Sequence, residues 1–347
     1  SSALSATDGS GKKHALGTTA VFRSAGTNSV VAGNRTLRLP VSISSRHPLS
    51  FNKRRYRGGF RLVSSGSGIT LLNVLDLEEY LRGVLKMEVN PAWSMEALKA
   101  QAVISRTYAL RSVLQNRGKG GYDLRDTVMS QVYRGMNAED PKTDQAIRAT
   151  RGMVLKYGGE FAFTPFHAHS GGATADVTTV WGGNMPYLKG VNEDFQTESP
   201  HSTWEASLSA AQVEDALRSA GVNVGRLQEL RVEQSDPFGR PTTLRAIGTS
   251  GSKTLKSHSF RMAAGSNVIR STLFSISSAA SSSSAPIPLA SLSQPKPVPP
   301  STPPGTGVPT SLTPMSAAEE RQLTDLTEQG VFNADPSSLS QPYALIA

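Results

Sequence analysis

The clearest periodic pattern in the chain runs from Asp76 to Leu110 and predicts two consecutive helices. Asp76 can cap the first helix, and Glu79 stands three residues later in the position of a capping box. Apolar residues then recur at three- and four-residue spacing, which indicates one buried stripe. The stripe consists of Leu77, Tyr80, Leu81, Val84 and Leu85.

A carboxylate, Glu88, occupies the next position of this stripe. A proline three residues further on limits the helix, so Glu88 falls at or just past its C-terminus. Three features should raise its pKa: burial against Met87, Val89 and Trp93, the negative end of the helix dipole, and the lack of a cation nearer in sequence than Lys86. A carboxyl group kept neutral near pH 7 can protonate a sugar oxygen. The alternative is an ordinary solvated carboxylate at a helix end.

The second helix is expected to open at Ser94 and to run to the glycines near position 120. Lys99 and Arg106 are seven residues apart and therefore share one face. For Lys99 a solvated basic edge is the ordinary interpretation, whereas for Arg106 a buried role and a role facing the site are both open. Gln101 and Tyr108 of the same helix are further candidate substrate contacts.

The rest of the pattern indicates an α+β fold. Short alternating runs from about 18 to 74 predict strands, and helices are expected at about 141–151 and 207–219 with strands around them. We expect a flexible segment at 1–17, one folded domain at 18–275, a linker at 276–315 and a tail at 316–347 with a candidate short helix. The linker is Pro/Ser-rich: ten of the 21 prolines lie between 277 and 314, and such a segment cannot bury enough surface to fold.

Composition excludes several classes of function and of binding site. With 37% hydrophobic and 18% charged residues the chain is globular in character. Its net charge is +9, and because the residues from 276 on carry −3, the folded part carries +9 + 3 = +12. The absence of cysteine excludes disulfides, thiolate catalysis and thiolate-bound metals. No apolar run reaches the length of a membrane span, and the first residue is Ser, as in a processed or truncated chain. The basic cluster at 53–57 has few interleaved aromatic residues, so nucleic acid is not an expected partner.

A histidine pair precedes a glycine-rich segment. His167 and His169 alternate along an expected strand, and with His201 they could bind a metal. Without a nearby cysteine or carboxylate, hydrogen-bonded structural histidines are the preferred interpretation, and we expect neither metal nor cofactor. The following loop should approach a ligand such as a sugar through its backbone amides and hydroxyls. The candidate contacts there are His169, Ser170, Gly171, Gly172 and Thr174.

The segments LEEYLRGVLKMEVNPAW and EALKAQAVISRTYAL resemble the central signature of the SpoIID/LytB domain, the stage II sporulation protein D family. Further segments agree in order: FHAHSGGATADVTTVWGG, PYLKGV, SPHSTWE, GRPTTLRAIG and FRMAAGSNVIRSTLF. The resemblance covers about Tyr56 to Phe274 and implies a catalytic domain with two central helices packed on mixed, short-stranded sheets around a substrate cleft. The resemblance further implies that the protein is a lytic transglycosylase that cuts peptidoglycan glycan strands lacking stem peptides. It implies a location outside the cytoplasm, in the cell envelope or periplasm. The family carboxylate matches Glu88. Some members bind zinc near the segment matching 167–170 with the help of cysteines, which this chain lacks.

The expected reaction is therefore cleavage of the MurNAc-GlcNAc β-1,4 bond with formation of 1,6-anhydro-MurNAc ends. Glu88 would protonate the glycosidic oxygen and then accept the proton of the C6 hydroxyl, so one carboxylate suffices where ordinary glycosidases need two. Glycan without stem peptides is a polyanion because each lactyl group carries a carboxylate, and Arg106 and Lys99 are candidates to pair with it. Two alternatives stay open: a non-catalytic module that enhances or recruits an N-acetylmuramoyl-L-alanine amidase, and a hydrolase using water with Asp123 or Asp126.

Overall fold

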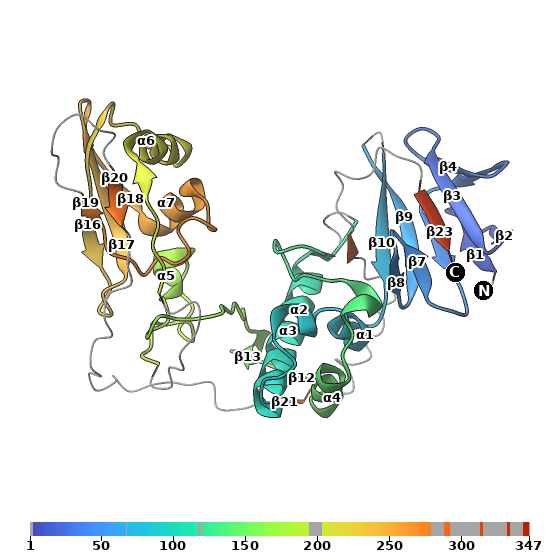
Figure 1. Cartoon of the computed structure of the whole chain (residues 1–347). Helices are drawn as coiled ribbons and strands as arrows, with labels where there is room; N and C mark the ends of the chain where they lie inside the picture. Colours follow the sequence, from blue (N-terminus) through green and yellow to red (C-terminus); the bar gives the residue numbers. More distant parts are fainter. Residues whose placement is uncertain are drawn as a thin grey trace. The chain divides into compact units, whose positions relative to one another are not determined.

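The chain is divided into two compact units in the computed structural model (Figure 1). Unit 1 comprises residues 1–165 and 309–347, and unit 2 comprises residues 166–308. The structure describes residues 3–66, 68–116, 119, 121–193 and 203–278, together with short strands at 288–291, 313–314, 332–333 and 343–346. The domain expected at 18–275 therefore extends over both units, and most of the expected linker and the expected tail helix lie outside the described residues.

Unit 1 begins with a series of short antiparallel strands. Its first strands are β1 (Leu4–Thr7), β2 (Lys13–Leu16), β3 (Thr19–Ser24), β4 (Ser29–Ala32), β5 (Arg35–Arg38), β6 (Val41–Ser44), β7 (Leu49–Phe51), β8 (Arg54–Tyr56), β9 (Gly59–Ser65) and β10 (Gly68–Val74). Short strands follow at β11 (Leu124–Arg125), β12 (Met153–Val154), β13 (Lys156–Tyr157), β14 (Glu160–Phe161), β21 (Thr313–Pro314), β22 (Phe332–Asn333) and β23 (Tyr343–Ile346). The two larger sheets have the orders β11-β22-β10-β9-β6-β1-β2 and β5-β4-β3-β23-β7-β8.

Alternating apolar residues build these sheets, as the sequence predicts for 18–74. Strand β6, for example, buries Val41 and Ile43 and exposes the serines between and after them. Residues 4–16 differ from the expected flexible segment, because β1 pairs with β2 and β6 and buries Leu4 and Ala6. The alternation in this segment is short, and its burial depends on pairing with β6, whose partner residues lie 35 to 39 positions further along the chain.

The helices of unit 1 are α1 (Leu77–Arg82), α2 (Leu85–Glu88), α3 (Met95–Asn116) and α4 (Pro141–Ala149), with a 3-10 helix η1 at Gly135–Ala138. Asp76 caps α1 by accepting the N–H groups of Glu78 and Glu79. The Glu79 carboxylate pairs with Arg57 at 2.9 Å and Arg82 at 3.2 Å in place of the expected capping box.

The single helix expected from 76 to 88 is broken at Gly83, although its apolar stripe is buried as predicted. The Gly83 carbonyl accepts the N–H of Arg134 at 3.1 Å and so leaves the helical hydrogen-bond ladder. The chain can approach this closely only because position 83 has no side chain: a Cβ there would lie 2.4 Å from the Tyr133 ring. The break is therefore a tertiary effect of the segment at 133–134.

Helix α3 begins where the sequence predicts, since Ser94 Oγ accepts the N–H of Ala97 at 3.3 Å. Its small residues Ala102, Ser105 and Ala109 are fully buried and allow close packing, whereas Ala97 is exposed. Helix α4 packs against α3 and α1.

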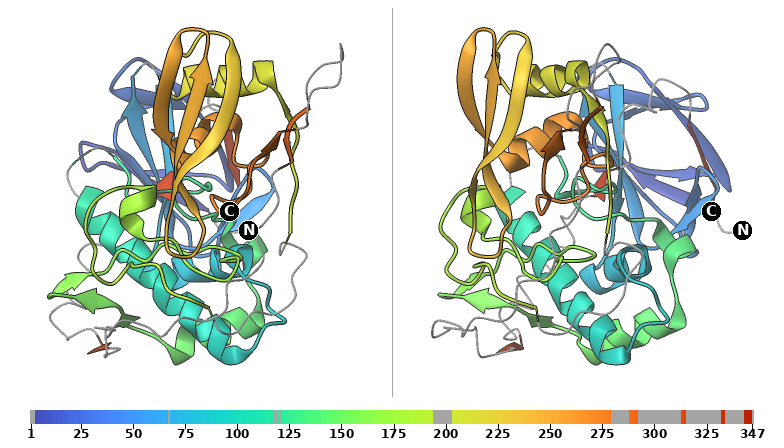
Figure 2. Two further views of the ribbon diagram at one scale, coloured as in Figure 1. Left: turned by 90° about the vertical axis from the view of Figure 1, so that its left-hand side faces the viewer. Right: turned by 60° about the vertical axis from the view of Figure 1, so that its left-hand side comes forward.

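Unit 2 contains a three-stranded antiparallel sheet with two helices on one of its faces (Figure 2). Its elements are α5 (Val177–Val180), β15 (Leu208–Ser209), α6 (Ala210–Ser219), β16 (Leu227–Ser235), β17 (Pro241–Gly248), β18 (Gly251–Lys256), α7 (Ser257–Ala264), β19 (Ser277–Ser278) and β20 (Pro288–Ser291). The sheet order is β16-β17-β18. A capping box of Ser209 and Gln212 begins α6, and the predicted inward residues Val213, Ala216 and Leu217 are buried. The mixed helices and small antiparallel sheets make the chain α+β, as expected.

Candidate active site around Glu88

Glu88 is the last residue of α2 and is half-buried. Its Oε1 accepts the backbone N–H of Val132 at 3.1 Å. Burial raises the pKa of the Glu88 carboxyl, and the Val132 N–H opposes this increase because it stabilises the carboxylate. Among the described residues, no Lys, Arg or His lies within salt-bridge distance of Glu88. The arrangement is a partly desolvated carboxyl group without a cationic partner, which suits a general acid.

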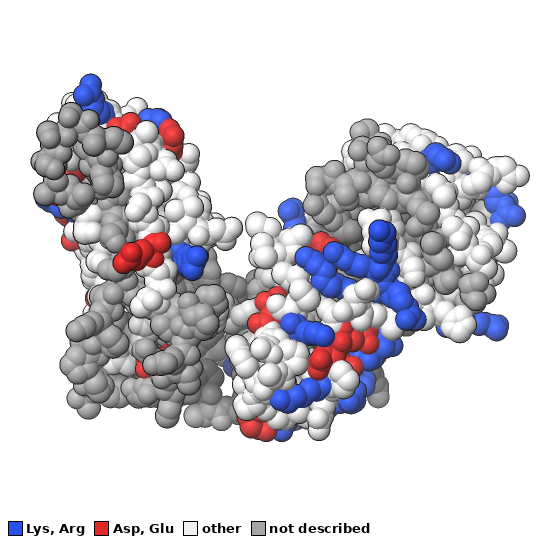
Figure 3. Space-filling model, viewed as in Figure 1, with Lys and Arg blue, Asp and Glu red and all other residues white. Residues whose placement is uncertain are grey.

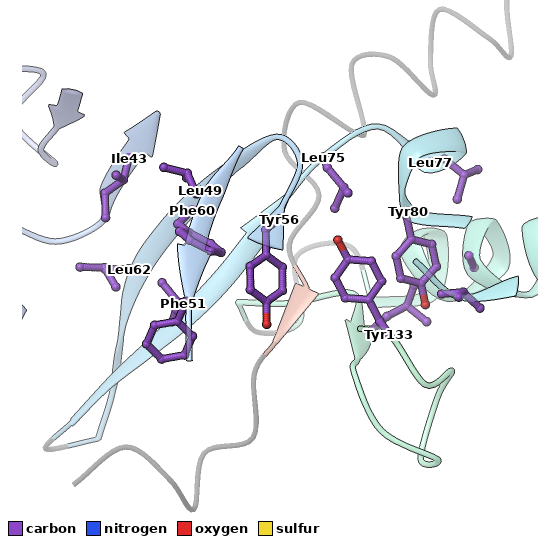
Figure 4. Close-up of a cluster of buried hydrophobic side chains, with 14 of the residues drawn as sticks. Ile43, Leu49, Phe51, Tyr56, Phe60, Leu62, Leu75, Leu77, Tyr80 and Tyr133 are labelled. Carbon is purple, nitrogen blue, oxygen red and sulfur yellow. The ribbon is translucent and has the colours of Figure 1, made fainter. Parts of the chain in front are cut away.

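The tyrosine residues beside Glu88 fix the segment that binds it. Tyr80 is fully buried in α1 and stacks on Tyr133 with ring centroids 5.2 Å apart (Figure 4). The Tyr80 hydroxyl donates to Gln131 Oε1 at 3.2 Å, and Gln131 Nε2 donates to the carbonyl of Ser105 in α3. Burial raises the pKa of Tyr80, and the nearby Glu88 carboxylate adds to that effect. Contacts on both sides of Val132 thus hold its N–H in place.

The prediction that Met87, Val89 and Trp93 are buried around Glu88 is only partly right. Val89 is buried, but Met87 is 43% exposed and Trp93 is 49% exposed. Lys86, the nearest cation in sequence, lies 3.7 Å from Asp140 of the α4 cap. The break at Gly83 reorients α2, so the apolar neighbours in sequence do not all become neighbours in the core.

Arg106 takes the buried role, and its expected contact with substrate does not fit the structure. The side chain is 0% exposed, and its Nε and Nη2 donate to the Glu78 carboxylate at 2.7 and 2.8 Å. The remaining N–H groups donate to Thr150 Oγ1 and to the carbonyls of Met153 and Ile147. All five donors of the guanidinium are used within unit 1, so Arg106 joins α1, α3 and α4.

The other candidates on α3 lie in different environments. Lys99 is partly exposed, and its Nζ pairs with Glu96 at 2.8 Å. Gln101 donates to Ser105 Oγ at 3.3 Å, and Tyr108 packs partly buried against the core. Of these residues, only Lys99 carries a charge, and its ammonium group remains accessible. An exposed ion pair between residues one helical turn apart opens readily to solvent or to a ligand.

The glycine-rich candidates lie in unit 2 and form a loop held by internal hydrogen bonds. His169 Nδ1 accepts the N–H of Gly171 at 3.0 Å, and Ser170 Oγ accepts the N–H of Gly172 at 3.0 Å while donating to Glu193. Gly171 and Gly172 have φ values of 80° and 107°, which side chains other than that of glycine rarely tolerate.

Two further residues complete this loop. Thr174 Oγ1 donates to the Lys189 carbonyl and accepts the N–H of Val191. Buried Arg240 donates to the carbonyls of Ser170 and Ala173 at 3.0 and 2.7 Å. Arg240 lies in the family-like segment GRPTTLRAIG, but nothing in the sequence indicated that its side chain binds a loop about seventy residues away.

The histidine pair does not lie on the expected strand. Residues 163–169 have no strand hydrogen bonds, and His167 and His169 belong to the loop before Ser170. No group of three potential metal ligands occurs among the described residues, and His201 lies outside them.

The surface charge of unit 1 and the hydropathy of the helices also bear on which partners the chain can have. Lys and Arg side chains gather on the face of unit 1 seen in Figure 3, with acidic side chains among them. The described residues contain no helix that combines the length and the apolar character needed to cross a membrane.

A known family matches the part of the chain that holds Glu88. The family model described as Stage II sporulation protein matches residues 65–157. An uncharacterised protein of Brachyspira hyodysenteriae is 30% identical over 205 residues, covering 59% of this chain and 55% of that protein.

Two relatives from Bacillus subtilis have descriptive names. The protein named Amidase enhancer is 32% identical over 184 residues, which cover 52% of this chain and 24% of the relative. Stage II sporulation protein D is 31% identical over 157 residues, which cover 41% of this chain and 46% of the relative. The chain thus spans about half the length of these relatives, or less. The family match, the named relatives and the two-helix segment that holds Glu88 lead to one conclusion: the chain contains a domain of the SpoIID/LytB family.

Proposed function

We propose that the chain is a peptidoglycan lytic transglycosylase that acts outside the cytoplasm on glycan strands lacking stem peptides. The bond cleaved is the MurNAc-GlcNAc β-1,4 bond, and the products end in 1,6-anhydro-MurNAc. The observation that carries the proposal is the half-buried Glu88, whose pKa is raised by burial and which has no cationic partner among the described residues.

In this mechanism the protonated Glu88 gives its proton to the glycosidic oxygen as the bond to the muramic acid anomeric carbon breaks. The resulting carboxylate then accepts the proton of the C6 hydroxyl as that oxygen bonds to the anomeric carbon. Proton and bond balance are complete without water, so a single carboxylate is enough. The N–H of Val132 stabilises the carboxylate form between the two steps.

Substrate contacts are assigned as part of the same proposal. Lys99 replaces Arg106 as the cation that pairs with a lactyl carboxylate, because its ammonium is accessible. Gln101 and Tyr108 are neighbouring contacts on α3. The loop from His169 to Thr174 in unit 2 is a separate candidate surface that binds sugar hydroxyls.

The test is incubation with defined glycan stripped of stem peptides, followed by mass analysis of the products. Products lighter by one water than hydrolysis products support the transglycosylase, and Glu88→Gln should remove them without unfolding the protein. Reducing-end products would instead indicate a hydrolase that uses water, with Asp123 or Asp126 as the partner of Glu88.

A second candidate function is supported by the relative named Amidase enhancer. In that case the chain binds the cell wall and enhances or recruits an N-acetylmuramoyl-L-alanine amidase. The absence of any glycan product, together with faster amidase release of stem peptides when the chain is added, would support this alternative. The same assays on Glu88→Gln separate the two, because an enhancer does not require a proton donor at position 88.

A further inference from the structure

Four large apolar side chains are exposed on the two segments that hold Glu88. We call them the apolar rim: Met87, Trp93, Val128 and Met129, with 43%, 49%, 85% and 72% exposure. Single exposed apolar residues are common on protein surfaces, but these four all lie within five residues in sequence of Glu88 or of Val132, whose N–H binds it. Such a concentration indicates a surface that a ligand or partner covers.

Both halves of the rim are tied to Glu88 by the chain. Met87 precedes Glu88 in α2. Trp93 lies in the following turn, where its backbone N–H donates to the Asn90 carbonyl at 3.0 Å. On the other segment, Met129 lies three residues before Val132, so their Cα atoms are within about 11 Å of each other.

Each half of the rim is also held in place. Lys142 of α4 donates from Nζ to the Trp93 carbonyl at 2.6 Å. The turn at 127–130 closes with a hydrogen bond from the Ser130 N–H to the Thr127 carbonyl at 3.0 Å. A ligand that covers the rim would therefore meet two preformed segments.

Chemistry favours a sugar chain as the occupant. A pyranose ring presents a C–H face that suits the indole plane of Trp93 and the adaptable thioether of Met129. Its hydroxyl edge and glycosidic oxygen offer hydrogen-bond partners to Glu88. An apolar protein surface would bury this carboxyl group and add no hydrogen-bond partner to the Val132 N–H, which is unfavourable.

We propose that Trp93 and Met129 form two sugar-binding subsites of an amino-sugar glycan, one on each side of the bond that Glu88 protonates. This inference rests on the proposed function and extends it, because it assigns contacts that decide where along the strand the bond is cut.

The test measures binding separately from chemistry. Glu88→Gln protein is titrated with defined glycan oligosaccharides lacking stem peptides, and the heat of binding is followed by calorimetry. Adding Trp93→Ala or Met129→Ala should weaken binding about tenfold, which corresponds to about 1.4 kcal/mol, whereas Trp93→Phe should stay within about threefold. The matched control is Met262→Ala, since Met262 is 55% exposed on α7 of unit 2 and should leave binding unchanged.

Intrinsic fluorescence adds a readout specific to the indole. Saturating glycan should shift tryptophan emission to shorter wavelength, and the shift should be lost in Trp93→Phe and kept in Trp181→Phe, the change at another exposed tryptophan. Loss of the shift in Trp181→Phe alone would contradict the assignment.

Three outcomes overturn the subsites: rim variants that bind glycan like the parent, no glycan binding by Glu88→Gln, or an amidase that requires the same rim residues while glycan does not. Binding that depends on the rim in a protein that makes no anhydro product would reject the proposed reaction and leave the subsites in place.

Discussion

Replacing Arg106 with methionine should destabilise unit 1 rather than weaken substrate binding. The change removes both hydrogen bonds to the Glu78 carboxylate, whose side chain is only 17% exposed, while the guanidinium itself is 0% exposed. Breaking a buried pair by removing one partner costs about 3–5 kcal/mol, because a charge remains buried and unpaired. For a unit of this size the melting temperature should fall by roughly 6–20 °C.

Unit 2 offers a matched control with the same bidentate geometry at the surface. Arg245 donates to Glu233 at 2.8 and 2.7 Å, and the two side chains are 30% and 29% exposed. Arg245→Met should therefore change the free energy of unfolding much less than Arg106→Met does, because solvent screens an exposed ion pair. A double change of Arg106 and Glu78 to methionine should recover part of the loss, since it also removes the orphaned carboxylate.

Urea unfolding followed by circular dichroism measures both variants, with the two units allowed separate transitions. Glycan titration of the folded Arg106→Met protein provides the second measurement and should match the parent. An unchanged free energy of unfolding together with weaker glycan binding would refute the structural role and restore Arg106 as a substrate contact.

The remaining predictions concern the acid, the metal and the helix break. Because burial raises the Glu88 pKa, the folded state binds this proton more tightly than the unfolded state, and the stabilisation is lost as pH rises through the folded pKa. Glu88→Gln should therefore gain stability relative to the parent as denaturation is repeated from pH 4 to pH 7, and the parent's cleavage rate should fall over the same rise. Chelation should leave activity unchanged, whereas loss that only zinc restores would assign a metal to the loop of His167 and His169. Gly83→Ala should lower the free energy of unfolding by about 1–3 kcal/mol because the Tyr133 ring must shift, and parent-like stability would contradict that packing.

Local rules were sufficient for the helices that begin with a capping residue. Asp76 and Ser94 accept backbone N–H groups at the start of α1 and α3, as predicted. The helix expected from 207 begins at Ala210 with Ser209 as its cap, and its predicted inward residues are buried. These signals involve residues only a few positions apart, so the sequence alone was enough to predict them.

Features that depend on distant segments were not predictable in this way. The break at Gly83 is caused by Tyr133 and Arg134, and the hydrogen bond to Glu88 comes from Val132, which is 44 residues away in sequence. The orientation of Arg106 toward Glu78 likewise depends on how α1 and α3 pack. A helix face in the sequence does not tell whether an arginine meets a buried carboxylate or a ligand.

The effect of Glu88 on stability can distinguish a glutamate that takes part in catalysis from one that only forms part of a binding surface. Val132 supplies its hydrogen bond among the described residues, and burial favours the neutral form, so the ionised carboxylate opposes folding at neutral pH. A surface that only recruits a partner would gain stability from glutamine at this position without any loss. Suppose that Glu88→Gln is more stable than the parent at pH 7 and does not cleave glycan. The carboxyl group then lowers stability but supplies a proton that cleavage needs, which is the pattern of a functional site. If Glu88→Gln is more stable and still enhances an amidase, the proton has no role, and recruitment becomes the better account.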